Sequence, residues 1–277
     1  MSVGTHDPPA PYPERGVAEL IGRGTCPFTV GPTRESSQLP ATELPIPQKH
    51  PSRLAVLFVL VGPPLLLFLA YAPFEQAVGG NPARFQAAVL PWLFPVVEGI
   101  FVLIALRLIH RDGQSWEQLA GFGKVPWRHE LPWALLIFLV MAGIIATYAL
   151  IVTLAAPSAA TSVIYSGFPW WYEAGMVITV PVFAGFCEET IYRAYAVTRL
   201  RALGFSPRST MILSALAFMT LHVDPVDFPY TFVIGLFLAW LYQKRGRLLP
   251  MILAHIAIDV IGYLGVFFVL PSILQYI

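Results

Sequence analysis

A cluster of six ionisable residues lies within the apolar runs of the C-terminal third of this sequence, and their types suit the activation of a water molecule. They are Glu188, Glu189, Arg193, His222, His255 and Asp259. A carboxylate or an imidazole can take a proton from an attacking water, and histidine with carboxylate can instead hold a metal ion that activates it. No serine or cysteine is paired with a base, and the His-Glu-x-x-His motif of soluble zinc proteases is absent. The water-activating groups are therefore expected on different helices.

The spacing of these residues indicates which of them form pairs. Glu189 precedes Arg193 by four residues, which is the favourable order for an ion pair along one helix. Glu188 points about 100° away around that helix, so we predict that it is the free carboxylate. His255 and Asp259 are also four residues apart and share one face of their helix.

Four residues are predicted to be catalytic: Glu188, His222, His255 and Asp259. Three others are predicted to be structural and to support them: Glu189, Arg193 and Phe218. Phe218 lies one turn before His222 and would form the packed floor beneath that ring. A direct role for Glu189 and Arg193 stays open. No cofactor is indicated, except that the four catalytic residues are also suitable ligands for a divalent metal such as zinc.

These residues lie on apolar segments that suit a membrane. A spanning helix needs about 20 predominantly apolar residues. Seven runs are candidates, of which the fifth and sixth are short: Leu54–Tyr71, Ala87–Leu108, Trp133–Ala155, Tyr172–Tyr195, Thr210–Val223, Tyr230–Tyr242 and Leu248–Leu270. We therefore predict an all-α membrane protein with about seven transmembrane helices, in which the last four form the catalytic core.

Basic residues alternate along the connections between these runs. Lysine and arginine gather before the first run and after the second, fourth and sixth, whereas the other connections hold one basic residue, Arg84. By the positive-inside rule, the basic connections lie in the cytoplasm. The N-terminus is thus predicted inside and the C-terminus outside. Residues 1–50 are polar and rich in proline, and are expected to be a disordered cytoplasmic tail; residues 51–160 hold the N-terminal membrane helices and residues 161–277 the catalytic core.

Composition agrees with a membrane protein and argues against a nucleic-acid partner. Hydrophobic residues make up 56% of the chain and charged residues 12%, against about a quarter charged in soluble domains. A formal net charge of +1 gives no basis for binding a polyanion. A charged side chain at the bilayer centre costs about 2.5–3.5 kcal/mol, so each one needs a partner or a wet cavity. Glu98, the one clear case in the first three runs, is predicted to be structural or a cavity wall.

Three motifs in the last four runs resemble those of the CPBP (Abi) family, which contains CAAX-prenyl proteases of the Ras-converting type and bacteriocin-processing or immunity proteins. The motifs are Glu188-Glu189-x-x-x-Arg193, Phe218-x-x-x-His222 and His255-x-x-x-Asp259. The similarity covers roughly residues 172–262. It implies an intramembrane protease core with a cavity that faces the cytosol. By motif position, Glu188 and His222 would activate the water, and His255 and residue 259 would stabilise the oxyanion.

Asp259 departs from the eukaryotic pattern of this family, which has asparagine at the same place. An ionised aspartate beside a developing oxyanion would destabilise it. Asp259 is therefore expected to be protonated, to orient His255 or to help hold a cation. Prokaryotic relatives also have an aspartate there, and we expect this chain in a prokaryotic plasma membrane.

The sequence thus favours an intramembrane endopeptidase that cleaves a membrane-associated or C-terminally processed, CAAX-like substrate. The expected partners are a peptide or protein substrate in the membrane and the lipid bilayer, and the oligomeric state is not indicated. A non-catalytic immunity or assembly factor with the same fold is one alternative. A proton-coupled transporter is another, but the sequence has no inverted repeat of the kind found in transporters.

Overall fold

The computed structural model describes the protein over most of its length after the predicted tail. The described residues are 44–77, 89–123, 125–155, 169–222, 225–265 and 267. The predicted disorder of residues 1–43 lies outside them. The last residues of the predicted tail make contacts instead: Leu44 packs against the hydrophobic core, and Gln114 Nε2 donates a hydrogen bond to the Pro45 carbonyl at 3.0 Å.

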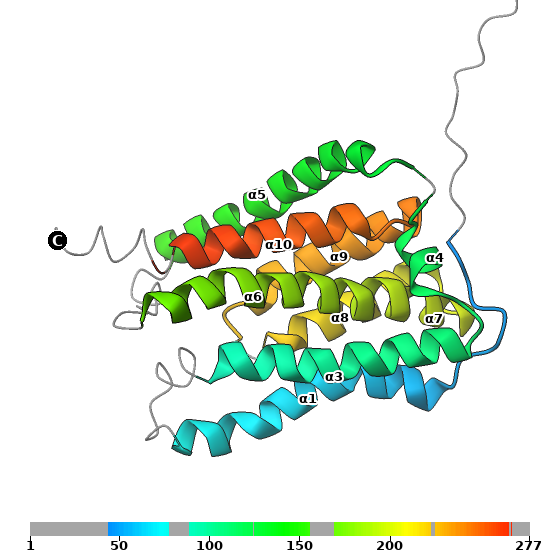
Figure 1. The fold of residues 1–277 in the computed structure, drawn as a ribbon, viewed down its shortest axis with the longest axis horizontal. Helices are drawn as coiled ribbons and strands as arrows, with labels where there is room; N and C mark the ends of the chain where they lie inside the picture. Colours follow the sequence, from blue (N-terminus) through cyan, green and yellow to red (C-terminus); the bar gives the residue numbers. More distant parts are fainter. Residues whose placement is uncertain are drawn as a thin grey trace, which may run out of the picture. The chain divides into compact units, whose positions relative to one another are not determined.

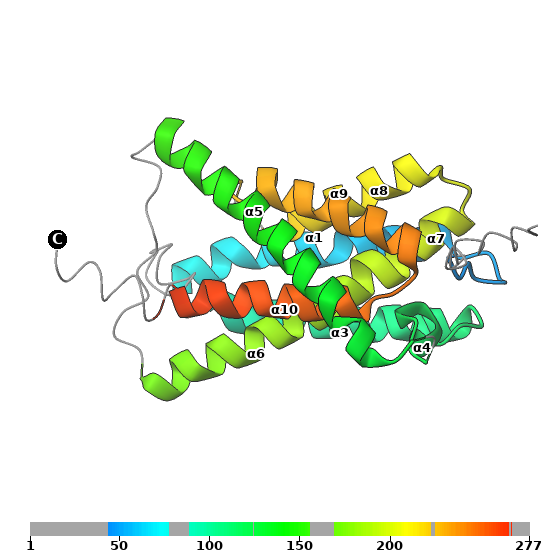
Figure 2. The same cartoon turned by 90° about the horizontal axis from the view of Figure 1, so that it is seen from above.

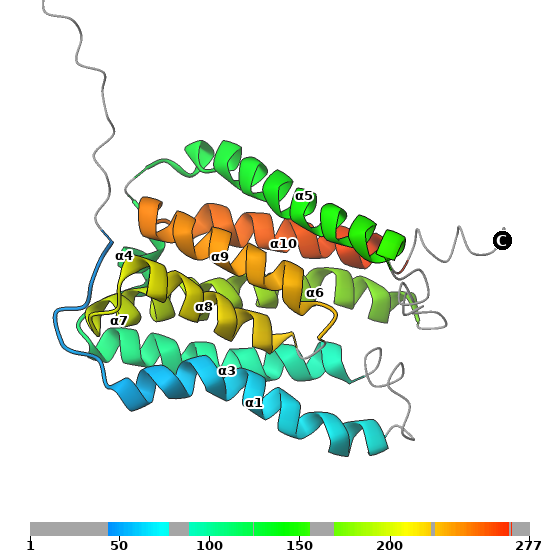
Figure 3. The same cartoon turned by 180° about the vertical axis from the view of Figure 1, so that it is seen from behind.

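Seven helices form a closed ring in which each helix packs against two neighbours. In order around the ring they are α1 (Arg53–Ala77), α3 (Leu90–Arg111), α6 (Trp170–Glu188), α10 (Leu249–Leu264), α5 (Leu131–Ala155), α9 (Phe228–Arg245) and α8 (Pro207–Leu221). α3, α6 and α10 lie side by side in Figure 1, and α8 and α9 come to the front when the molecule is seen from behind in Figure 3. Figure 2 shows α5 running obliquely over α9 and α10. The all-α fold is confirmed.

A π-helical segment lies inside this ring. The segment η3 (Glu189–Tyr195) continues α6 and leads into α7 (Ala196–Ala202), and the Ala196 N–H bonds the carbonyl of Ile191, five residues earlier. All seven residues of η3 are buried, and the segment packs against α3, α6, α8 and α9. π-helical turns are rare and frequently occur at functional sites. An ordinary α-helix was predicted for Tyr172–Tyr195. The observed helical run extends from Trp170 to Ala202 and is widened where it is π-helical.

Four stretches among the described residues are long and apolar enough to cross a membrane. They are Arg53–Tyr71, Trp92–Arg111, Trp127–Ala155 and Trp170–Ala202, and Leu249–Leu264 is a shorter apolar helix. The chain is thus a multi-pass membrane protein. Each of the seven predicted runs coincides with a helix of the ring, but α8, α9 and α10 are too short or too polar to qualify by themselves. The count of seven crossings stays a prediction.

Helix ends differ from the predicted ends because local caps, rather than the apolar runs, determine them. α8 begins at Pro207, before the predicted Thr210, because the Ser206 side chain accepts a hydrogen bond from the Ser209 N–H at 3.1 Å. α9 extends past the predicted Tyr242 and ends at Gly246, whose φ of 58° is left-handed. The last residues of the seventh run, from 268 onward, lie outside the described residues.

The basic connections gather at one end of the ring. Leu248 N–H donates to the Ala120 carbonyl at 3.0 Å, and the Arg247 guanidinium pairs with Glu130. At the same end, buried Arg199 at the end of α7 pairs with Asp112 after α3, with Nε and Oδ2 3.4 Å apart. This arrangement agrees with the alternation of basic loops along the sequence. Which side of the membrane holds this end stays a prediction.

Gly185 allows α6 and α10 to approach closely, one turn before Glu188. A Cβ at this position would lie 2.6 Å from Ile256 Cγ1 and 3.1 Å from the Ile256 backbone nitrogen. Gly185→Ala is therefore expected to push the two helices apart and to lower stability by about 1–3 kcal/mol, which is typical of overpacking. Thermal melting of the purified protein in detergent would measure the loss.

Gly175→Ala is the matched control because it lies on the same helix with no atom within 4 Å of the added Cβ. This variant should be as stable as the wild type, or slightly more stable since alanine favours helix. Equal melting temperatures for the two variants would contradict the close contact of α6 with α10.

Candidate active site

All four residues predicted to be catalytic line one cavity of about 500 Å³. Glu188 is the last residue of α6, His222 caps the C-terminus of α8, and His255 and Asp259 lie on α10. The rest of the lining comes from α3, α5 and α9, and includes Phe94, Met141, Tyr230 and Thr231. The predicted core of four helices thus supplies the chemical groups, and the N-terminal helices help to enclose them.

His255 lies between three carboxyl groups. Its Nδ1 is 2.9 Å from Glu189 Oε1, and its Nε2 is 3.7 Å from both Glu188 Oε2 and Asp259 Oδ2. The contact with Glu189 has hydrogen-bond geometry, so Nδ1–H donates to that carboxylate and fixes the ring. The other ring nitrogen faces Glu188 and Asp259, and only 5% of His255 is exposed.

Glu189 has two partners rather than the one predicted. Its Oε2 is 3.2 Å from Arg193 Nε, and both side chains are fully buried. The spacing predicted a Glu189–Arg193 pair with Glu188 as the free carboxylate, and it did not predict the contact of Glu189 with His255. Two features explain this: the imidazole has a nitrogen on each side, and the π-helical segment begins at Glu189, where the α-helical spacing of 100° ceases to apply.

Arg193 is buried without a conventional hydrogen bond. None of its three guanidinium nitrogens has a hydrogen-bond partner among the described residues. Its charge is compensated by Glu189 at 3.2 Å and by the face of the Phe218 ring, whose centroid is 4.2 Å from Cζ. Arg193 is thus held between a carboxylate and an aromatic ring.

Phe218 also packs against both histidines. Its ring centroid is 5.0 Å from that of His222 and 6.1 Å from that of His255, edge to face in both cases. His222 Nδ1 lies 3.1 Å from the Phe218 carbonyl. A carbonyl oxygen only accepts, so Nδ1 carries a proton and Nε2 is left with a lone pair. This is the form of histidine that can accept a proton.

The structure brings His222 and Glu188 to the same cavity but not into contact. No hydrogen bond or ion pair joins them within the described part of the chain. Glu188 instead contacts a residue that was given no chemical role from the sequence. This residue is Glu98 on α3, which is 1% exposed and in hydrogen-bonding contact with Glu188. The sequence did single out Glu98, because it is the one clear acidic residue within the first three apolar runs.

Part of the lining of the cavity can be placed at one end of the ring. Asp227, just before α9, and Tyr263, near the end of α10, line it at the end of the ring opposite the basic connections. At the basic end, the short helix α4 (Trp116–Ala120) covers η3, and Trp116 Nε1 donates to Thr190 Oγ1 at 3.1 Å. The side of the membrane on which the cavity opens therefore stays a prediction.

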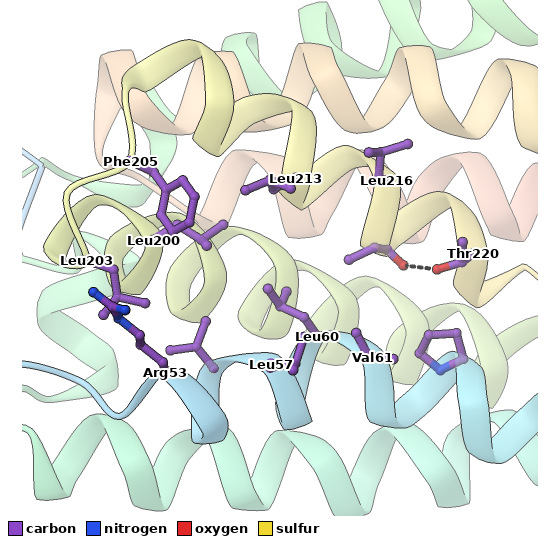
Figure 4. Close-up of a pocket in the computed structure, with 13 residues that line it drawn as sticks. Arg53, Leu57, Leu60, Val61, Leu200, Leu203, Phe205, Leu213, Leu216 and Thr220 are labelled. Atoms are coloured by element: carbon purple, nitrogen blue, oxygen red, sulfur yellow. Dashed lines mark hydrogen bonds between the residues drawn. The ribbon is translucent and has the colours of Figure 1, made fainter.

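In the described residues, no three His, Cys, Asp or Glu side chains are grouped closely enough to hold a metal ion. A larger cavity of about 720 Å³ lies elsewhere, between α1, α7 and α8. Figure 4 shows its lining, in which Leu57, Leu60 and Leu216 are among the apolar side chains and Arg53 lies at one end. Its lining, as far as the described residues form it, has no carboxylate or imidazole. The chemistry is therefore assigned to the smaller cavity.

Fold and site together define an all-α, multi-pass membrane protein with buried carboxylates and imidazoles around one cavity. Residues 169–261 match the family model described as "Type II CAAX prenyl endopeptidase Rce1-like". The match covers about a third of the chain and includes all four predicted catalytic residues. It confirms the resemblance to the CPBP family and supports a protease of the CAAX type. No curated protein and no solved structure matches the chain.

Proposed function

We propose that this protein is an intramembrane endopeptidase that hydrolyses a peptide bond of a membrane-associated or C-terminally processed, CAAX-like substrate. The observation that carries the proposal is the convergence of Glu188, His222, His255 and Asp259, from three separate helices, on one cavity of about 500 Å³. Each of these ionisable side chains would cost several kcal/mol in lipid, so their presence around one cavity indicates a functional site. The family match to residues 169–261 supports the same reaction.

In this mechanism a water molecule between Glu188 and His222 is the nucleophile. One of the two takes a proton from the water as it attacks the peptide carbonyl, and a general base of this kind contributes about 10²–10⁴-fold to the rate. The lone pair on His222 Nε2 suits that role, as does the carboxylate of Glu188. The proton then passes to the leaving amine.

His255 and Asp259 are assigned to the oxyanion that forms on the attacked carbonyl. Nδ1–H of His255 donates to Glu189 at 2.9 Å, which orients Nε2 toward the cavity. A buried carboxylate commonly fixes the ring of a functional histidine in this way. Nε2 donates to the oxyanion in the imidazolium form of the ring, in which both nitrogens carry a proton. Asp259 Oδ2 lies 3.7 Å from the same Nε2, so its contribution is to orient His255 rather than to donate directly as an asparagine would.

Direct detection of cleavage tests the proposal. Purified protein in detergent or liposomes would be incubated with prenylated and unprenylated CAAX-type peptides, and the products identified by mass spectrometry. We expect a new internal C-terminus from the wild type. His222→Gln is expected to lower the rate by about 10²–10⁴-fold because it removes a general base.

His110→Gln is the matched control, since His110 is exposed in the last turn of α3 and does not line the cavity. It should cleave at the wild-type rate. Full activity of His222→Gln would refute the assigned role, and a wild type that cleaves no peptide would favour the non-catalytic immunity or assembly factor. Loss of activity on chelation, with recovery on adding zinc, would show that a metal takes part in activating the water.

A further inference from the structure

Glu98 is a buried acid on α3, outside the segment that matches the protease family. It is 1% exposed, and its Oε1 has no hydrogen-bond partner among the described residues. It is also the only acidic residue in α3, which is otherwise strongly apolar up to its last turn. An ionised side chain in mid-membrane costs about 2.5–3.5 kcal/mol. A carboxyl group at this position is therefore expected to have a specific partner.

That partner is Glu188. The two side chains are in hydrogen-bonding contact, and α3 packs along both α6 and η3. Two ionised carboxylates have no proton to share and repel each other. A hydrogen bond between them requires that one of the two carries a proton. If Glu188 is the carboxylate that accepts a proton from water, Glu98 is the protonated partner.

Glu98 lies behind Glu188 and away from the substrate. Glu188 lines the cavity, whereas Glu98 is not among the residues that line it. On the other side, Glu188 Oε2 is 3.7 Å from His255 Nε2. Glu188 is thus held between a histidine of α10 and an acid of α3. A residue in this place acts on the reaction through its contact with Glu188 rather than by lining the cavity.

We propose that Glu98 is a positioning residue: its protonated carboxyl group donates a hydrogen bond to Glu188 and holds that carboxylate in the orientation that faces the water. This rests on the proposed hydrolytic function. It gives α3 a part in the chemistry that the family match at residues 169–261 does not cover. Other polar groups near this pair are Cys187, Tyr192, Arg193 and Asp259.

Two variants of similar size separate hydrogen bonding from packing. Glu98→Gln keeps a donor in its amide NH2 group, whereas Glu98→Leu has none. We expect Glu98→Leu to lower kcat by about 10–100-fold, as misplacement of a catalytic group does, with KM within about twofold of wild type because the cavity lining is intact. Glu98→Gln should retain kcat within about threefold. A merely structural residue would show no such rescue by glutamine.

Infrared spectroscopy tests the protonation of Glu98 independently of enzyme activity. The difference spectrum of wild type minus Glu98→Gln should contain the carbonyl band of a protonated carboxylic acid. Absence of that band, an unchanged kcat in Glu98→Leu, or equal losses in both variants would overturn the proposal. If Glu98→Leu does not fold, Glu98→Gln and the infrared band decide the question. A wild type that cleaves no peptide would refute the proposed function, and with it the positioning role.

Discussion

Glu188→Gln is expected to leave the protein folded and to lower the rate of peptide hydrolysis by about 10²–10⁴-fold. Glutamine has the same shape as glutamate, and its amide oxygen can still accept the hydrogen bond from Glu98. It cannot accept a proton from water, so the loss should fall on kcat. Steady-state kinetics with a cleavable peptide would measure it, and size-exclusion chromatography would establish that the variant is folded.

Glu173→Gln provides the comparison, because Glu173 lies in the first turn of the same helix and does not line the cavity. It should have wild-type kinetics. If Glu188→Gln cleaved peptides as fast as Glu173→Gln, the general base would have to be sought elsewhere, and His222 alone would be the next candidate. Unfolding of Glu188→Gln would instead indicate that this carboxylate is structural.

Arg193→Met is expected to have the largest effect on stability. The guanidinium is fully buried between Glu189 and the Phe218 ring, and methionine fills similar space without the charge. Removing one partner of a buried ion pair strands the other charge and costs about 3–5 kcal/mol. For a protein of this size, such a loss lowers the melting temperature by roughly 6–20 °C. Low expression and a broadened elution profile would accompany it.

A double variant distinguishes a stranded charge from lost packing. Arg193→Met with Glu189→Gln removes both charges, while the amide oxygen of the introduced glutamine can still accept the hydrogen bond from His255 Nδ1. The double variant should therefore be more stable than Arg193→Met alone. Arg208→Met, at an exposed position in α8, serves as the control and should melt like wild type. A double variant no better than the single one would show that packing, not charge, is what Arg193 supplies.

Much of the fold could be predicted because a membrane helix leaves a strong trace in the sequence. Each predicted apolar run coincides with a helix of the ring, since a span must be apolar over its whole length. The ends of the helices were less accurate, as Ser206 and Gly246 show, because single capping residues determine them. The segment η3 could not be foreseen, because a π-helical turn has no pattern of its own in an apolar sequence.

The residues of the site that belong to sequence motifs could be predicted. The contacts that depend on how separate helices pack could not. Glu188, His222, His255 and Asp259 could be chosen from residue type and spacing, and all four line one cavity. The contact between Glu189 and His255 depends on how α10 packs against the start of η3, which spacing along one helix does not reveal. Glu98 is separated from Glu188 by ninety residues, so its role depends on the packing of α3.

The π-helical segment also sets the phase between the two halves of the run from Trp170 to Ala202. A π-type hydrogen bond closes on the fifth residue back and an α-type bond on the fourth, so the residues on either side of η3 are out of step with one another. If Glu189–Tyr195 closed as plain α-helix with the same number of residues, Glu188 would turn by about 100° relative to Arg199, because a π turn takes in one residue more than an α turn. Either Glu188 would leave the cavity or Arg199 would lose Asp112. In this protein the number of residues in the segment determines the site as much as their identity does.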